Sequence, residues 1–326
     1  MTPLIKRVLL ATDFSSCAAR AQDYAVFLAS SWGAELNILH VLEFPPGMNP
    51  DYPVNNLYLN QLRKEAERGL DELVERAARA GVSINNHVAL GIPSQRVCAM
   101  ADECHDDLIV LGTRGRTGLE HILLGSTAER VIRMAPCPVL GVHLAGTKPV
   151  GEEDARGVGL PIRLDRVLAP IDFSDCSLDA LEYAAQFTSQ MKATMTLLHV
   201  MEPVAYGLDF TLGSAVDRDR QRERTKARLG ELATALRSSG LTADHVVRGG
   251  LPADSILEVA RAQTSDMIVM GTHGRRGISH LMNGSVAEAV LRKAGCPVLT
   301  VRSPKFASGH RRIVMASDGQ IANAGT

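Results

Sequence analysis

Short apolar runs alternate with longer amphipathic segments along the first half of the chain. The apolar runs have the length and composition of buried strands and cover residues 7–11, 35–41, 82–90, 108–111 and 139–142. The segments between them have helical periodicity, and helices are expected over about 15–32, 57–80, 93–104 and from 126 onward. Strands that alternate with helices in this way predict an α/β fold with a parallel, doubly wound sheet.

The same pattern recurs in the second half of the chain at a constant spacing. The block RVLLATDFSSC returns as RVLAPIDFSDC, and Asp13 therefore matches Asp172, 159 positions later. The block beginning DLIVLGTRG returns as DMIVMGTHG with the same offset, so no net insertion separates the matched blocks. The chain is expected to be a duplicated domain, with domain one at 1–143, a linker at 144–164, domain two at 165–302 and a C-terminal tail at 303–326.

Composition and charge limit the function classes. The chain has 45% hydrophobic and 22% charged residues, the balance of an ordinary globular protein, and a net charge of −1. No basic excess is available to neutralise a nucleic acid. No apolar stretch approaches the ~20 residues of a membrane span, and none near the first residue resembles a signal peptide, so a cytoplasmic location is expected. The six cysteines form no CxxC pair and are interpreted as buried thiols.

A glycine-rich loop follows the fourth predicted strand in both copies. The pattern is G-x-x-G-x9-G-S, and it runs from Gly112 to Ser126 and again from Gly271 to Ser285. Glycines allow backbone N–H groups to approach an anion, and a helix that begins near the serine adds a positive dipole end. The loop also leaves the carboxyl end of a strand, where open α/β sheets bind ligands. The pattern favours a phosphate site over the alternative, a tight turn capped by serine, because both copies keep it.

The combined motifs resemble the ATP-binding branch of the universal stress proteins, over residues 5–143 and 164–302. The loop is neither a Walker A motif nor a dinucleotide G-x-G-x-x-G. The resemblance implies two tandem Rossmann-like domains, each a five-stranded parallel sheet sandwiched by helices. It also implies ATP as the ligand, with Mg2+ as its candidate counterion. One departure is Ala11, where the family often has a proline that copy two keeps as Pro170. Equal affinity of the two copies is therefore not expected.

The resemblance also assigns candidate binding residues. An aspartate after strand one and a backbone group at the end of strand two would contact the adenine, and the glycine loop would hold ribose and phosphates. In copy one these residues are Asp13, Val41, Gly112, Arg114, Gly115, Gly125 and Ser126. In copy two they are Asp172, Val200, Gly271, His273, Gly274, Gly284 and Ser285. The two aspartates have an alternative interpretation, in which they only cap the following helix.

No catalytic or metal-binding set accompanies the loop. His40 and His199 end strand two in each copy and are interpreted as packed histidines, and the arginine-rich segment 218–228 as a solvated helix face. The absence of a recognisable general base favours a binding module with at most slow ATP hydrolysis. The expected function is that of an ATP-binding regulator of the stress response, acting on a protein partner that the sequence does not identify. The alternatives are a nucleotide-dependent enzyme, such as an ATPase or nucleotidyl transferase, and an interaction scaffold that binds no nucleotide.

Two further expectations concern assembly. The fifth strands, at 138–142 and 297–301, are apolar edges that need covering, and the two copies are expected to pair through them as an internal pseudo-dimer. Pairing of whole chains into a homodimer is left open. Residues 312–318, RIVMASD, align with the start of strand one, and this segment is expected to pack against one of the domains.

Overall fold

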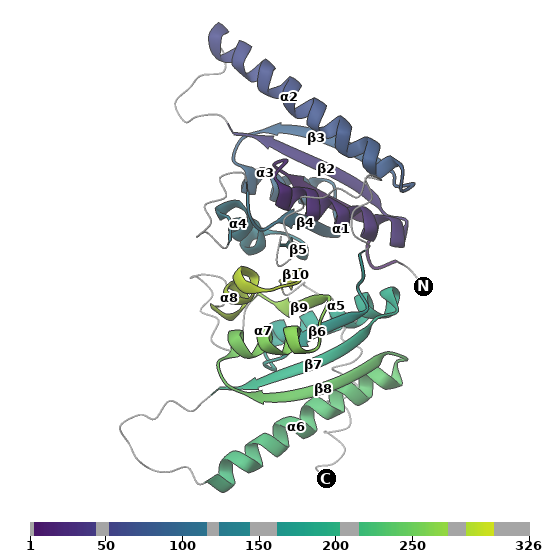
Figure 1. The fold of residues 1–326 in the computed structure, drawn as a ribbon, viewed down its shortest axis with the longest axis vertical. Coiled ribbons are helices and arrows are strands. Elements are labelled where there is room, and N and C mark those ends of the chain that lie inside the picture. The colour runs from purple at the N-terminus through teal and green to yellow at the C-terminus, as the bar shows by residue number, and fades with distance from the viewer. Residues whose placement is uncertain are drawn as a thin grey trace, which may run out of the picture. The chain divides into compact units, whose positions relative to one another are not determined.

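The structure is a computed structural model, and it describes residues 3–43, 52–115, 124–143, 162–202, 215–272 and 285–302. The chain divides into two compact units, Met1–Ile162 and Arg163–Thr326. Each unit contains one copy of the sequence repeat and is described by itself (Figure 1). The unit boundary falls within the segment that the sequence identifies as a linker.

Unit one alternates strands and helices as the apolar pattern predicts. Its strands are β1 (Arg7–Thr12), β2 (Glu35–Leu42), β3 (Ile84–Leu90), β4 (Leu108–Gly112) and β5 (Val139–Val142). Its helices are α1 (Ser16–Trp32), α2 (Pro53–Ala78), α3 (Pro93–Glu103) and α4 (Ser126–Met134). The largest difference from the prediction is the start of α2, four residues earlier than expected, where Pro53 occupies a first-turn position that suits proline.

Unit two repeats this order. Its strands are β6 (Arg166–Pro170), β7 (Thr194–Met201), β8 (Thr242–Gly249), β9 (Met267–Gly271) and β10 (Val298–Val301). Its helices are α5 (Asp175–Met191), α6 (Ala215–Ser238), α7 (Pro252–Ala262) and α8 (Ser285–Lys293).

Each unit has a parallel five-stranded sheet with helices on both faces, so the predicted fold class is confirmed. The strand order is β3-β2-β1-β4-β5 in unit one and β10-β9-β6-β7-β8, the same order read in reverse, in unit two. The connections from β1 to β2 and from β2 to β3 cross the sheet in one direction, and the connections from β3 to β4 and from β4 to β5 cross it in the other. Right-handed connections therefore place α1 and α2 on one face and α3 and α4 on the opposite face. The order reverses between β1 and β4, the position where such sheets bind ligands.

The two sheets differ at one place beside this reversal. The ladder between β1 and β4 runs from Val8 through Ala11, but the ladder between β6 and β9 includes only Val167 and Leu168. Pro170 stands where unit one has Ala11, and proline has no N–H to donate to a neighbouring strand. The proline that distinguishes the two copies thus coincides with an earlier end to strand pairing at the carboxyl edge.

A buried polar chain marks the amino-terminal edge of the sheet in unit one. Asn85 Nδ2 donates to Asn37 Oδ1 at 3.2 Å, and Asn37 Nδ2 donates to Asp106 Oδ1 at 2.7 Å. Asp106 is only 5% exposed, and its second oxygen has no hydrogen-bond partner. Burial therefore raises the pKa of this carboxyl to about 6, although the Asn37 hydrogen bond and Arg7 oppose the shift.

Candidate functional site

A left-handed turn follows the first strand of each unit. Phe14 has φ of +59° and Phe173 has φ of +63°, both uncommon for residues other than glycine. The turn is tied by Asp13, whose Oδ1 accepts the Ser15 N–H at 3.0 Å, and by Asp172, whose Oδ1 accepts the Ser174 N–H at 3.0 Å. The same backbone therefore carries the predicted adenine-side aspartate in both copies.

The alternative interpretation of the aspartates as helix caps is wrong. The N-cap of α1 is Ser15, whose side chain accepts from the Ala18 N–H, and the N-cap of α5 is Ser174, whose side chain accepts from Ser177. Asp13 lies two residues before the cap and bonds the cap residue's own N–H. Its second oxygen, Oδ2, faces the glycine loop.

The phenylalanine of the turn is packed on the histidine of strand two. Phe14 and His40 have ring centroids 4.4 Å apart, and Nδ1 of His40 lies 2.8 Å from the carbonyl oxygen of Thr12. The corresponding distances for Phe173 and His199 are 5.0 Å between rings and 2.6 Å from Nδ1 to the Ile171 oxygen. Both histidines are buried, which supports the interpretation of these residues as packed.

The long second helix reaches this phenylalanine differently in the two units. In α2 the contact residue is Gly69, and a Cβ there would stand 2.8 Å from the Phe14 ring. The matching residue of α6 is Arg228, whose guanidinium carbon lies 4.3 Å from the centroid of the Phe173 ring. A cation–π contact in unit two therefore replaces direct backbone packing in unit one.

The glycine loop of unit one lies against the start of α1. A Cβ at Gly112 would stand 2.9 Å from the backbone carbon of Cys17, so only glycine permits this approach. The loop then crosses Ser15, whose Oγ donates to the Arg114 carbonyl oxygen at 3.4 Å. The Gly125 N–H donates to the Thr113 carbonyl oxygen at 2.7 Å and brings the two ends of the loop together.

The most informative distance in unit one joins the loop to the aspartate. An ideal Cβ at Gly115 would stand 2.9 Å from Asp13 Oδ2. Backbone and carboxylate thus approach as closely as they do only because residue 115 has no side chain. Two residues separated by about a hundred positions in the sequence meet at the reversal of strand order.

The helix end beside the loop suits an anion. Helix α4 begins at Ser126, and its N-cap is Gly125, which makes no side-chain capping bond. The first-turn N–H groups of a helix have no partner within the helix, and the dipole favours negative charge there. Arg114 adds a positive side chain to the same edge.

The remaining candidate residues fall at matching places. Val41 and Val200 lie one residue before the ends of β2 and β7, and both are partly exposed. In unit two, Gly271 ends β9, and a Cβ there would stand 2.9 Å from the Cys176 carbonyl oxygen. His273, Gly274 and Gly284 lie outside the described residues, as does the side chain of Ser285, the first residue of α8.

Sequence reasoning missed a support beneath the loop of unit one. The buried Thr113 hydroxyl lies 3.2 Å from the Val142 carbonyl oxygen and 2.7 Å from Nδ1 of His143. Burial and the nearby Arg114 lower the pKa of His143 to about 4, so the ring is neutral at pH 7 and shares one hydrogen bond with the Thr113 hydroxyl. The repeated Gly-Thr at the start of both loops is the sequence feature that could have indicated this threonine.

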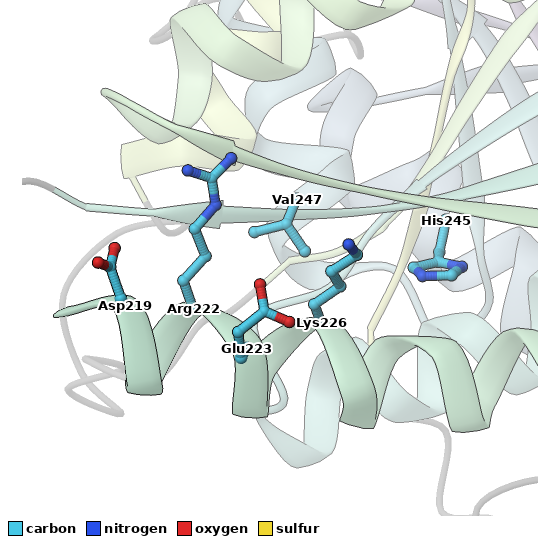
Figure 2. Close-up of a pocket in the computed structure, with 6 residues that line it drawn as sticks. All are labelled: Asp219, Arg222, Glu223, Lys226, His245 and Val247. Atoms are coloured by element: carbon cyan, nitrogen blue, oxygen red, sulfur yellow. The ribbon is translucent and has the colours of Figure 1, made fainter. Parts of the chain in front are cut away.

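A cavity of about 390 Å³ lies away from these residues, between α6 and β8 of unit two (Figure 2). Its lining residues are Asp219, Arg222, Glu223, Lys226, His245 and Val247. The four charged residues lie on α6 and are exposed, in agreement with the interpretation of 218–228 as a solvated helix face. Mixed charge of this kind indicates no particular ligand.

Two classes of feature do not occur in the described part of the chain. None of its groups of His, Cys, Asp and Glu is arranged to hold a metal ion. None of its helices is long and apolar enough to cross a bilayer.

Comparison with known proteins decides the family. The model of the universal stress protein family matches residues 4–143 and, separately, residues 163–302. The chain belongs to the universal stress protein family. A universal stress protein of Methanocaldococcus jannaschii is 36% identical over 140 residues, which are 43% of this chain and 82% of that protein.

Tandem members of the family align with both units. A universal stress protein of Mycobacterium bovis is 26% identical over 298 residues, covering 84% of this chain and 92% of that protein. The crystal structure of a universal stress protein from Archaeoglobus fulgidus covers 93% of this chain and 98% of that chain, with a TM-score of 0.68 at 22% identity. This last likeness concerns the fold alone.

Proposed function

We propose that each domain binds ATP at the carboxyl edge of its sheet and that the bound nucleotide regulates the contacts of this universal stress protein with a partner. The close approach of Gly115 to Asp13 carries the proposal. It leaves a backbone cradle beside a carboxylate, and a side chain at residue 115 would fill it. Such a cradle allows one ligand to contact the loop backbone and the aspartate at the same time.

The residues of unit one suit all three parts of a nucleotide: the base, the ribose and the phosphates. Asp13 and the backbone at Val41 would take the base side, because they lie at the carboxyl ends of β1 and β2. The loop from Gly112 to Gly115 and the first turn of α4 would hold ribose and phosphates. Mg2+ enters only as a counterion of the phosphates. Unit two would use Asp172, Val200, Gly271, His273, Gly274, Gly284 and Ser285 in the same way.

Binding rather than turnover is the role that the side chains favour. Asp13 is engaged by the Ser15 N–H, and His143 is neutral and hydrogen-bonded to Thr113. Neither group is placed to activate water, and rapid phosphoryl transfer needs a positioned group of that kind. We therefore propose at most slow ATP hydrolysis.

The test is nucleotide content and turnover of the purified full chain. Mass spectrometry of denatured protein should release ATP, and calorimetry with added ATP should show saturable binding. A chain that carries no nucleotide and binds none would favour the scaffold alternative. Phosphate release at enzymatic rates, above about 1 per second, would favour the enzyme alternative.

A further inference from the structure

Helix α5 of unit two is buried on every side over more than two turns. All residues from Ser177 through Ala185 are buried. Among the described elements, α5 packs mainly on strands of its own sheet: β9, β6, β10 and β7. Figure 1 shows the helix lying along one face of that sheet. One sheet covers only one side of a helix, so another part of the protein must cover the outer side.

The matching helix of unit one identifies which residues are outermost. In α1 the buried positions follow one face, whereas Ala19, Arg20, Asp23 and Val26 are partly exposed. Arg20 and Asp23 form an ion pair at 3.3 Å, with 24% of each side chain exposed. The residues of α5 at these four positions are Leu178, Asp179, Glu182 and Ala185, and all four are buried. We call these four residues the outer stripe of α5.

Charge limits what can cover the outer stripe. Asp179 is 1% exposed and Glu182 is 3% exposed. Buried carboxylates stay ionised only beside positive charge or hydrogen-bond donors. Leu178 adds an apolar surface at one end of the stripe. The cover must therefore combine cations with apolar side chains.

The C-terminal tail has this composition. Residues 303–326 include Lys305, His310, Arg311 and Arg312 and a single acid, Asp318, and Arg312 is followed by the apolar residues 313–315. The linker at 144–161 has two cations and three acids, so it suits two carboxylates less well. The glycine loop is a third candidate for the cover, but it occurs in both units. Because the unit that contains the matching loop still leaves Arg20 and Asp23 partly exposed, the loop does not account for the burial of α5.

The tail also starts from a suitable place. Strand β10 ends at Val301, and the Cys176 thiol in the first turn of α5 donates to the Val301 carbonyl oxygen at 3.7 Å. Glu182 is six residues along the helix from Cys176, about 9 Å at 1.5 Å per residue. The ten residues from Val301 to Arg311 can span about 33 Å when extended, so the arginines can reach the whole stripe.

We propose that the C-terminal tail packs along the outer stripe of α5, with Arg311 and Arg312 beside Asp179 and Glu182 and residues 313–315 against Leu178. The tail then completes the core of the second domain. It also explains why this helix carries buried acids where the first domain has a partly exposed ion pair.

The test uses full-length chains and pairs each substitution with a control. The double variant R311E/R312E should lower the melting temperature by about 3 °C or more and speed hydrogen exchange across residues 175–191 about tenfold. The linker variant K148E/R156E should change neither. Neutralising the acids with D179N/E182Q should remove most of the effect of R311E/R312E, because interacting sites are not additive.

Three results would overturn the proposal. The first is unchanged exchange in α5 and an unchanged melting temperature in R311E/R312E. The second is a larger effect of the linker variant, which would assign the cover to residues 144–161. The third is that R311E/R312E lowers the melting temperature equally with and without D179N/E182Q, which would show that the arginines do not interact with the acids.

Discussion

Replacing Gly115 by alanine should displace the Asp13 carboxylate without unfolding the domain. The new Cβ would stand 2.9 Å from Oδ2, closer than carbon and oxygen pack. The carboxylate cannot simply turn away, because its other oxygen accepts the Ser15 N–H. Residue 115 is outside the left-handed region, so alanine causes no backbone strain there. The fold should survive while the nucleotide contact is lost.

The size of the effect follows from the contact that is lost. A hydrogen bond to a charged group contributes about 1.5–3 kcal/mol. Loss of the Asp13 contact should therefore weaken ATP binding in unit one by about 10- to 150-fold. Valine at the same position adds two methyl groups to the cradle and should abolish binding in that unit, and Gly274→Val should do the same in unit two.

Calorimetry of the full chain separates the two units. Wild-type protein should show two ATP sites, and Gly115→Ala should leave one unchanged and weaken the other. The control is Gly295→Ala, because a Cβ at Gly295 meets no atom within 4 Å. If Gly115→Ala binds two ATP molecules with wild-type affinity, residue 115 does not line the site and the reasoning is refuted.

Three further predictions concern stability. Lys192 has φ of +55° at the position where α1 ends on Gly33, so Lys192→Gly should stabilise the protein by up to about 1 kcal/mol in chemical denaturation, and Gly33→Lys should have the opposite effect. Gly69→Ala should destabilise unit one by about 1–3 kcal/mol, seen as a lower melting temperature than in Gly295→Ala, because its Cβ would overlap the Phe14 ring. Asp106 has a folded pKa near 6, above its ordinary 3.8, so its contribution to stability falls as pH rises through this window. Asp106→Asn should therefore stabilise the protein by up to about 3 kcal/mol at pH 7.5 and far less at pH 4 in melts at both values.

The sequence predicted the strands and the helices because these depend on local patterns. The run from Leu108 to Leu111 is apolar and short, and Gly125 with Ser126 begins a helix, so neighbouring residues alone determine these elements. Pairing of the two domains through their fifth strands remains a prediction. A double-cysteine variant with one new thiol at the edge of each strand would test it by cross-linking.

The contacts that complete the site could not be predicted in this way. Asp13 and Ser15 can both cap a helix, and only the left-handed turn at Phe14 decides that serine takes this position. The contact between Gly69 and Phe14 joins residues 55 positions apart, and no local pattern distinguishes it from Arg228 over Phe173. Asp106 and Asn37 meet only once β2 and β4 lie in the same sheet.

The left-handed turn also connects the candidate site with the second helix of its domain. Glycine would remove the strain at residue 14, yet phenylalanine stands there in both copies and its ring packs on a histidine of strand two. A backbone movement at Asp13 would turn the peptide it shares with Phe14, whose ring lies directly against Gly69 on α2. In unit two, the same movement at Asp172 reaches the exposed Arg228 on α6. A displacement of Asp172 would therefore reach the surface as a repositioned positive charge, whereas a displacement of Asp13 would reach a helix that packs directly on the Phe14 ring.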